Sequence, residues 1–176
     1  NQYPFHISGG MCQRVMLSIA LALRPKLLIA DEPTSNLDVT LQAEILERLK
    51  RLCKELGSAL LLITHDMGVV ANMADKVAMM YGGTIVEYAD TKDLFQYPLH
   101  PYTWGLLQSI PRLNKPDTAL RPIPGSPPDP IDLPDQCPYM PRCPKATNEC
   151  RLSARPPLTE TEPGHFVACY NLITYD

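Results

Sequence analysis

The prolines of this 176-residue chain are concentrated in its second half. Of the 19 prolines, all but Pro4, Pro25 and Pro33 lie at residue 98 or later. Proline fixes its own φ angle and cannot donate a backbone hydrogen bond, so helix interiors and central strands tolerate it poorly. The sequence therefore predicts two parts: regular helices and strands in residues 1–90, and a largely irregular extension, rich in proline and cysteine, in residues 91–176.

Two long helices are predicted in the first part. The first spans residues 9–23, because Ser8 is a favourable N-cap and the residues after it are mostly apolar. With so little polar surface, this helix is expected to be largely buried. The second begins after Asp38, another N-cap candidate, carries apolar residues at helical spacing and ends at Gly57, which suits a C-cap.

Two apolar runs alternate with these helices. Residues 27–31 and 59–63 are short and strongly apolar, which is typical of buried parallel strands. Residues 76–81 and 84–88 flank two glycines and predict a hairpin. Strands that alternate with helices predict an α/β fold with parallel pairing.

Charge and hydropathy exclude several classes of protein. The formal net charge is −3, whereas neutralising a phosphate backbone requires a basic surface, so no nucleic-acid partner is expected. The longest apolar-rich stretch, residues 15–23, is too short to span a bilayer, and no signal peptide is visible. Because Asn1 is not a methionine and a helix-starting motif lies close to it, we expect a C-terminal piece of a longer protein.

The first chemical motif is Ser8-Gly9-Gly10, which opens the first predicted helix. Backbone N–H groups at a helix start attract anions, and glycines let a phosphate approach the backbone closely. A simple serine cap with a glycine turn would explain the same residues. The motif alone therefore does not decide between phosphate binding and helix capping.

The second motif is Asp31-Glu32, at the carboxyl end of the first predicted strand. Ligands bind at this edge of open α/β sheets. An aspartate there can hold a hydrated Mg²⁺, and a neighbouring glutamate can polarise an attacking water. The alternative is a solvated charged pair, but residues 33–38 continue at once as Pro-Thr-Ser-Asn-Leu-Asp.

These motifs, in this order, resemble the ATP-binding-cassette (ABC) ATPases. The resemblance covers residues 1–90 and rests on Ser-Gly-Gly-Met, the strand ending in Asp-Glu-Pro-Thr-Ser-Asn-Leu-Asp, and Ile-Thr-His-Asp. It implies the C-terminal part of an ABC-type P-loop ATPase sheet. It also implies that Ser8, Gly9 and Gly10 form the signature motif, which contacts the γ-phosphate of ATP bound to the opposite subunit.

The same resemblance implies roles for four further residues. Asp31 is similar to the Walker B aspartate near Mg²⁺, and Glu32 to the catalytic base. Asp38 is similar to the D-loop aspartate, which crosses the dimer interface, and His65 to the switch histidine that senses the γ-phosphate. No Walker A loop of the form G-x-x-x-x-G-K-[ST] is found in the sequence, so this chain alone is expected neither to bind nor to hydrolyse ATP.

The extension resembles the C-terminal region of oligopeptide/dipeptide importer ATPases. The resemblance rests on His100-Pro101-Tyr102-Thr103, on residues 123–129 and on a cysteine cluster. It implies an identical or paired second ATPase subunit, integral membrane permeases and, indirectly, a substrate-binding protein as partners. It also implies peripheral attachment to the cytoplasmic face of the membrane.

Four cysteines lie in the extension: Cys137, Cys143, Cys150 and Cys169. Four thiolates suit a [4Fe–4S] cluster or a structural Zn²⁺. The tight cysteine pairs usual for zinc are absent and two of the cysteines precede prolines, which favours iron–sulfur, as does the family resemblance. Four reduced thiols remain an alternative, and His165 is a weaker ligand candidate expected at the surface.

Two functional hypotheses arise from these residues. The first is an ATP-hydrolysing subunit that powers import of di- and oligopeptides or a related small solute. The alternative is a non-catalytic metal-binding or iron–sulfur-binding interaction module on a cassette scaffold. Intact Glu32 and His65 favour the enzyme.

Overall fold

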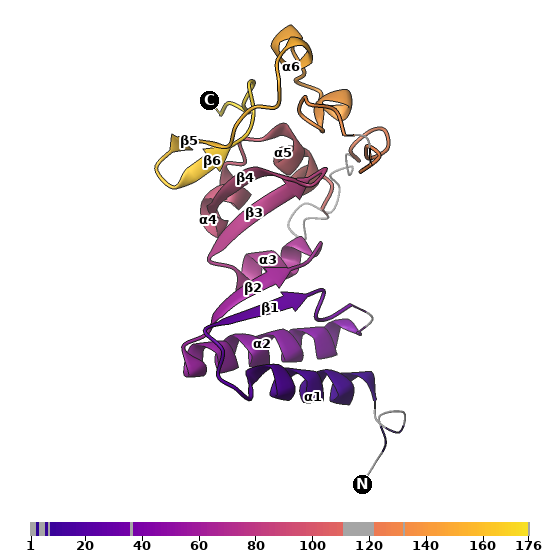
Figure 1. The fold of residues 1–176 in the computed structure, drawn as a ribbon, viewed down its shortest axis with the longest axis vertical. Coiled ribbons are helices and arrows are strands. Elements are labelled where there is room, and N and C mark those ends of the chain that lie inside the picture. Colours follow the sequence, from indigo (N-terminus) through magenta and orange to yellow (C-terminus); the bar gives the residue numbers. More distant parts are fainter. Residues whose placement is uncertain are drawn as a thin grey trace. The chain divides into compact units, whose positions relative to one another are not determined.

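The computed structural model of the protein describes residues 3, 6, 8–35, 37–110, 122–131 and 133–175 (Figure 1). The chain divides into two compact units, Asn1–Ala74 and Asp75–Asp176. This division reflects packing, whereas the expected change at residue 90 reflects composition. The assignment of residues 1–90 and 91–176 to separate domains stays a prediction.

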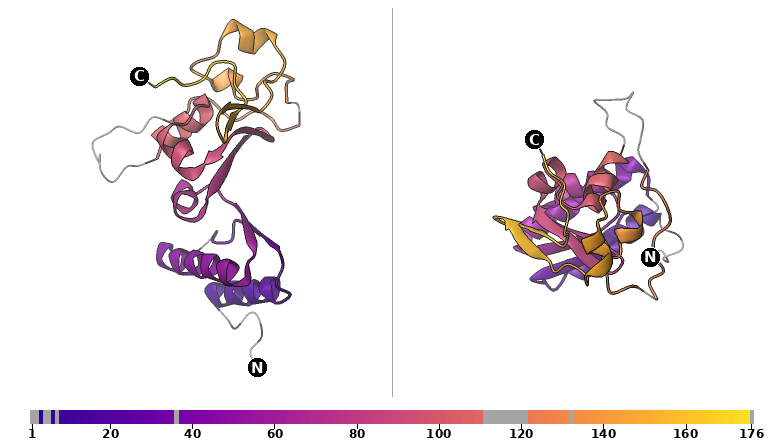
Figure 2. Two further views of the ribbon diagram at one scale, coloured as in Figure 1. Left: turned by 90° about the vertical axis from the view of Figure 1, so that its left-hand side faces the viewer. Right: turned by 90° about the horizontal axis from the view of Figure 1, so that it is seen from above.

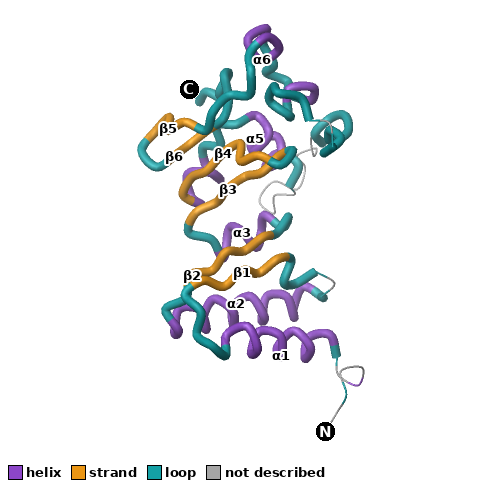
Figure 3. Tube along the Cα trace, viewed as in Figure 1, coloured by secondary structure: helices purple, strands orange, loops and turns teal. Residues whose placement is uncertain are grey.

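The first unit is built on two parallel strands, β1 (Leu27–Asp31) and β2 (Ala59–Ile63). Their register runs from Leu27 opposite Ala59 to Asp31 opposite Ile63. Helices α1 (Gly9–Leu21) and α2 (Val39–Leu56) lie on one side of the strand pair (Figure 3), and α3 (Met67–Met73) comes after β2. The predicted helices and the parallel α/β pairing are confirmed.

The start and end of α2 are set by the predicted caps. The Asp38 side chain accepts a hydrogen bond from the backbone N–H of Leu41 at 2.9 Å, and Gly57 ends the helix with a left-handed φ of 67°. Ser8 likewise accepts from the N–H of Met11, at the longer distance of 3.4 Å. Local sequence therefore sets where these helices begin and where α2 ends.

One small core holds the first unit together. Residues alternate along β1 so that Leu28 and Ala30 are buried, while Leu27 and Ile29 are exposed. The buried pair packs with side chains from both long helices, and the buried members of this core are Leu21, Leu28, Ala30, Leu49 and Cys53. One face of the strand pair is thus covered by helices.

The expectation that helix 9–23 is largely buried was wrong. In α1 only Gly10 and Leu21 are buried, and Met16 and Ile19 are each 64% exposed. The helix packs against α2 along one side, and much of its remaining apolar surface is exposed. The strands are likewise buried on one face only, because Ile29, Leu61 and Ile63 are exposed.

The second unit contains a four-stranded antiparallel sheet in the order β3–β4–β6–β5. The predicted hairpin is confirmed as β3 (Lys76–Tyr81) and β4 (Thr84–Asp90). Strands β5 (Thr159–Glu162) and β6 (His165–Val167) come from the extension (Figures 1 and 2). Glu87 of β4 lies opposite Val167 of β6. The extension is therefore less irregular than its proline content predicts.

Short helices complete this unit. Helices α4 (Thr91–Gln96) and α5 (Pro101–Gln108) come after β4. A 3₁₀ turn, Met140–Arg142, and α6 (Asn148–Leu152) lie in the cysteine-containing segment. No helix in the described part of the chain is long and apolar enough to cross a membrane.

Candidate functional site: a Glu–His pair and a cysteine pocket

Glu32 and His65 meet where the two parallel strands end. Glu32 directly follows β1, and its N–H donates to the carbonyl of Ile63 at 2.9 Å, which extends the strand pairing by one step. His65 lies two residues after β2, and its Nδ1 is 2.7 Å from Glu32 Oε1. The parallel register therefore brings together two residues that are 33 positions apart in sequence.

The electrostatics of this pair are simple. The hydrogen bond to Glu32, and then its negative charge, raise the pKa of His65 above its usual 6.5. An ionised carboxylate can only accept, so Nδ1 carries the proton of this bond. Glu32 also has a left-handed φ of 45°, a conformation that costs free energy in a non-glycine residue and is common at functional sites.

The loop that carries His65 is fixed by its neighbour Asp66. The Asp66 carboxylate accepts from the N–H groups of Gly68 and Val69 at the start of α3. It also accepts from Gln42 Nε2, on the first turn of α2, at 3.1 Å. The sequence analysis did not identify Gln42, whose partner Asp66 lies 24 positions away in the sequence.

The two other predicted residues of this region are Asp31, on β1, and Asp38, the N-cap of α2. Asp31 is the last residue of β1, and its side chain is exposed. Asp38 begins α2 and is committed to its cap. The structure shows Asp38 as a helix cap and leaves its expected role at a dimer interface as a prediction.

Gly9 and Gly10 differ in what they permit. A Cβ atom on Gly10 would lie 2.7 Å from Leu41 Cδ2, whereas one on Gly9 would meet nothing within 4 Å. Gly10 therefore allows α1 and α2 to approach closely, and Gly9 leaves the helix start open. None of the hydrogen bonds described joins Ser8 to Glu32 or His65. Further along α1, Arg14 forms an ion pair with Glu44 of α2 at 2.7 Å.

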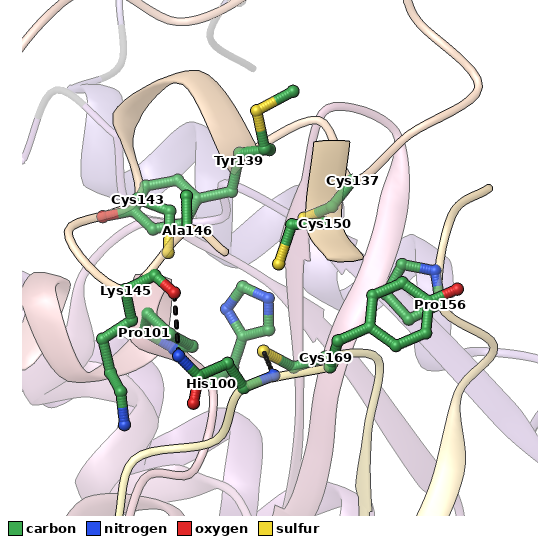
Figure 4. A pocket seen from close by; sticks show the side chains of 13 residues that line it. His100, Pro101, Cys137, Tyr139, Cys143, Lys145, Ala146, Cys150, Pro156 and Cys169 are labelled. Carbon is green, nitrogen blue, oxygen red and sulfur yellow. Dashed lines mark hydrogen bonds between the residues drawn. The ribbon is translucent and has the colours of Figure 1, made fainter. Parts of the chain in front are cut away.

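The four cysteines of the extension line one pocket together with His100 (Figure 4). All four are free thiols. Burial raises the pKa of Cys137 and Cys143, and raises that of Cys169 to about 11. Without a bound metal cation, these three thiols stay protonated at neutral pH.

The cysteines share this pocket without forming a finished ligand set. Among the described residues, no group of three or more His, Cys, Asp or Glu side chains is placed to hold a metal ion. The fold therefore brings the predicted residues to one place, and their role as metal ligands stays a prediction.

His100 is the pocket residue with an unmatched polar atom. Its ring is 1% exposed, and burial lowers its pKa to about 4. Nδ1 accepts the backbone N–H of Tyr102 at 3.0 Å, whereas Nε2 is buried and has no hydrogen-bond partner among the described residues. Sequence reasoning noted His100 only as part of a motif.

Glu87 holds the backbone beside this histidine. Its carboxylate is fully buried and accepts the N–H groups of Leu99 at 2.6 Å and His100 at 3.1 Å. The third donor is His165 Nε2, at 2.7 Å. The expectation that His165 lies at the surface was wrong, because it is 3% exposed and braces this carboxylate.

Comparison with known proteins agrees with this arrangement. The family model for the ABC transporter matches residues 1–35, which indicates the general class of the chain. The model for the oligopeptide/dipeptide transporter, C-terminal region, matches residues 86–150. The chain thus belongs to the oligopeptide/dipeptide branch of the ABC transporter family, and the resemblance stated from its motifs is confirmed.

Individual relatives give the same result. The chain is 51% identical over 168 residues to the oligopeptide transport ATP-binding protein OppD of Escherichia coli (strain K12), covering 96% of this chain and 49% of that protein. It is 52% identical to the oligopeptide transport ATP-binding protein AppD (96% and 51% covered) and 47% identical to the dipeptide transport ATP-binding protein DppD (96% and 50% covered), both of Bacillus subtilis (strain 168). The chain spans about half the length of these curated relatives.

Proposed function

We propose that this chain is part of the ATP-hydrolysing subunit of an ABC importer for di- and oligopeptides or a related small solute. The observation that carries the proposal is the 2.7 Å contact between Glu32 and His65 at the carboxyl ends of β1 and β2. The printed names of the relatives, which describe oligopeptide and dipeptide transport ATP-binding proteins, support it.

The residues of the pair have separate tasks in this proposal. Glu32 accepts hydrogen bonds at the end of β1 and would orient a water for attack on the γ-phosphate of ATP. His65 holds its proton on Nδ1 toward Glu32, which leaves Nε2 for the phosphate. The raised pKa of His65 favours a positive charge, which would stabilise negative charge developing on the phosphate.

Asp31 would hold Mg²⁺. Its carboxylate is exposed at the end of β1, and carboxylate oxygens are ligands that this hard cation prefers. The ion, when bound, neutralises charge on the phosphates. Asp31 therefore completes the set of side chains that the two strand ends present.

The start of α1 would act on a second subunit. Ser8 and the open backbone at Gly9 suit the γ-phosphate of ATP held by the opposite subunit, identical or paired. Because no Walker A motif is present in these residues, the chain by itself is proposed to be inactive. The assembled ATPases would attach to membrane permeases on the cytoplasmic face and serve a substrate-binding protein through them.

The cysteine pocket would hold a [4Fe–4S] cluster. Four thiols line the same pocket as His100, whose buried Nε2 is unmatched, and four thiolates are the donor set that such a cluster requires. The cluster would supply a cross-link within a segment that builds little core of its own. Zn²⁺ is the alternative occupant, and free thiols the third possibility.

The test of the ATPase proposal is Glu32→Gln in the full-length subunit assembled with its partner. Loss of the carboxylate should lower ATP turnover by about 100-fold or more, the range expected for removal of a general base. Glu47→Gln is the matched control, since Glu47 is exposed on α2, and its turnover should equal that of the wild type. Full turnover by Glu32→Gln would favour the non-catalytic module instead.

A further inference from the structure

His100 lines the cysteine pocket, and its buried Nε2 has no hydrogen-bond partner among the described residues (Figure 4). His100 caps α5, and its Nδ1 lone pair is occupied by the N–H of Tyr102. A neutral ring that accepts on Nδ1 carries its proton on Nε2, so this nitrogen is a donor and cannot be a metal ligand. A buried donor without an acceptor costs free energy, which points to an acceptor that the described residues do not provide.

The backbone that carries the His100 ring is held in place by Glu87. Glu87 accepts the N–H groups of Leu99 and His100, and His165 braces Glu87 from β6. The ring of Tyr139 lies beside the imidazole, with 5.9 Å between ring centroids. The imidazole is therefore held in place among the pocket-lining cysteines (Figure 4).

We propose that His100 donates its Nε2–H to a sulfur atom of the cluster held by the four cysteines and thereby raises its reduction potential. The proposal rests on the [4Fe–4S] assignment above. A hydrogen bond to sulfur stabilises the more negative, reduced form of such a cluster more than the oxidised form. His100 is thus a positioning residue that tunes the cluster and does not bind the iron.

The test uses two substitutions that distinguish the role of Nδ1 from the role of Nε2. In His100→Asn, the side-chain oxygen can still accept the N–H of Tyr102, but no donor reaches the position of Nε2. In His100→Gln, an N–H group is restored near that position. Thr103→Val is the control, since Thr103 is fully buried on the same helix but does not line the pocket.

Each protein is purified without oxygen, assayed for iron and sulfide, and titrated with dithionite while reduced cluster is monitored by electron paramagnetic resonance. His100→Asn should shift the one-electron equilibrium about tenfold toward the oxidised cluster, which is about 59 mV. His100→Gln should recover much of this shift, and Thr103→Val should match the wild type.

The possible failures are distinguishable. An unchanged potential in His100→Asn, with iron and sulfide equal to the wild type, would overturn the role of His100 and leave the cluster standing. Iron loss in His100→Asn that His100→Gln reverses would support donation, whereas loss in both variants would overturn it. Wild-type protein that holds zinc without sulfide, or no metal, would overturn both this inference and the cluster.

Discussion

Replacing Glu87 by glutamine should strongly destabilise the second unit. The carboxylate is fully buried and accepts three hydrogen bonds, from Leu99, His100 and His165. Glutamine has nearly the same shape but only one accepting oxygen, and its amide group donates. At least one of the three donors must then face another donor.

The magnitude can be worked from those contacts. Hydrogen bonds to a charged group contribute about 1.5–3 kcal/mol each, and a buried donor left unpaired costs about 1–3 kcal/mol. Loss of the charge and of one acceptor should therefore lower the free energy of unfolding by about 3 kcal/mol. For a unit of roughly 100 residues, at about 4 °C per kcal/mol, Tm should fall by about 12 °C.

The assay can report on this unit alone. Trp104, on α5, is the one tryptophan of the chain, so its fluorescence during urea or thermal unfolding reports on the second unit. Glu160→Gln is the control, because Glu160 accepts a single N–H, from Gly164, at an exposed site of the same sheet. A loss below about 0.5 kcal/mol in Glu87→Gln, similar to the control, would refute the reasoning.

Two further predictions concern the first unit. Glu32→Gln should lower the pKa of His65 toward 6.5, which an NMR titration would measure. In the wild type, the Glu32–His65 pair stabilises the fold below about pH 6.5. This contribution is lost as the pH rises through the raised pKa of His65. No change in the pKa would show that the contact does not form in solution. Gly10→Ala should destabilise by about 1 kcal/mol more than Gly9→Ala in urea unfolding, because only the Gly10 Cβ meets Leu41; equal effects would contradict the close packing of α1 on α2.

Much of the first unit could be predicted because its signals are local or regular. Ser8, Asp38 and Gly57 cap helices where the sequence places them. The contact between Glu32 and His65 was also accessible, since parallel strands of similar length place their ends at one edge of a sheet. The exposure of α1 could not be predicted, because apolar content alone does not reveal which surfaces a chain has available to cover a helix.

The second unit was harder for physical reasons. Strand β5 is Thr-Glu-Thr-Glu and exposed throughout, so no apolar alternation marks it as a strand. The pairing of Glu87 with His165 joins residues 78 positions apart, and nothing local to either residue indicates a buried pair. The unmatched nitrogen of His100 becomes visible only when the partners of its ring are counted in the structure.

The most direct test of the central claim is the mass and nucleotide content of the full-length subunit carrying Glu32→Gln, after incubation with ATP and Mg²⁺. If Glu32 serves the hydrolytic step and the start of α1 completes a neighbouring site, this variant should elute from a sizing column as an ATPase dimer that retains unhydrolysed ATP. Wild-type protein should release ADP and dissociate. A Glu32→Gln protein that stays monomeric and free of nucleotide, while the wild type hydrolyses ATP normally, would contradict the account.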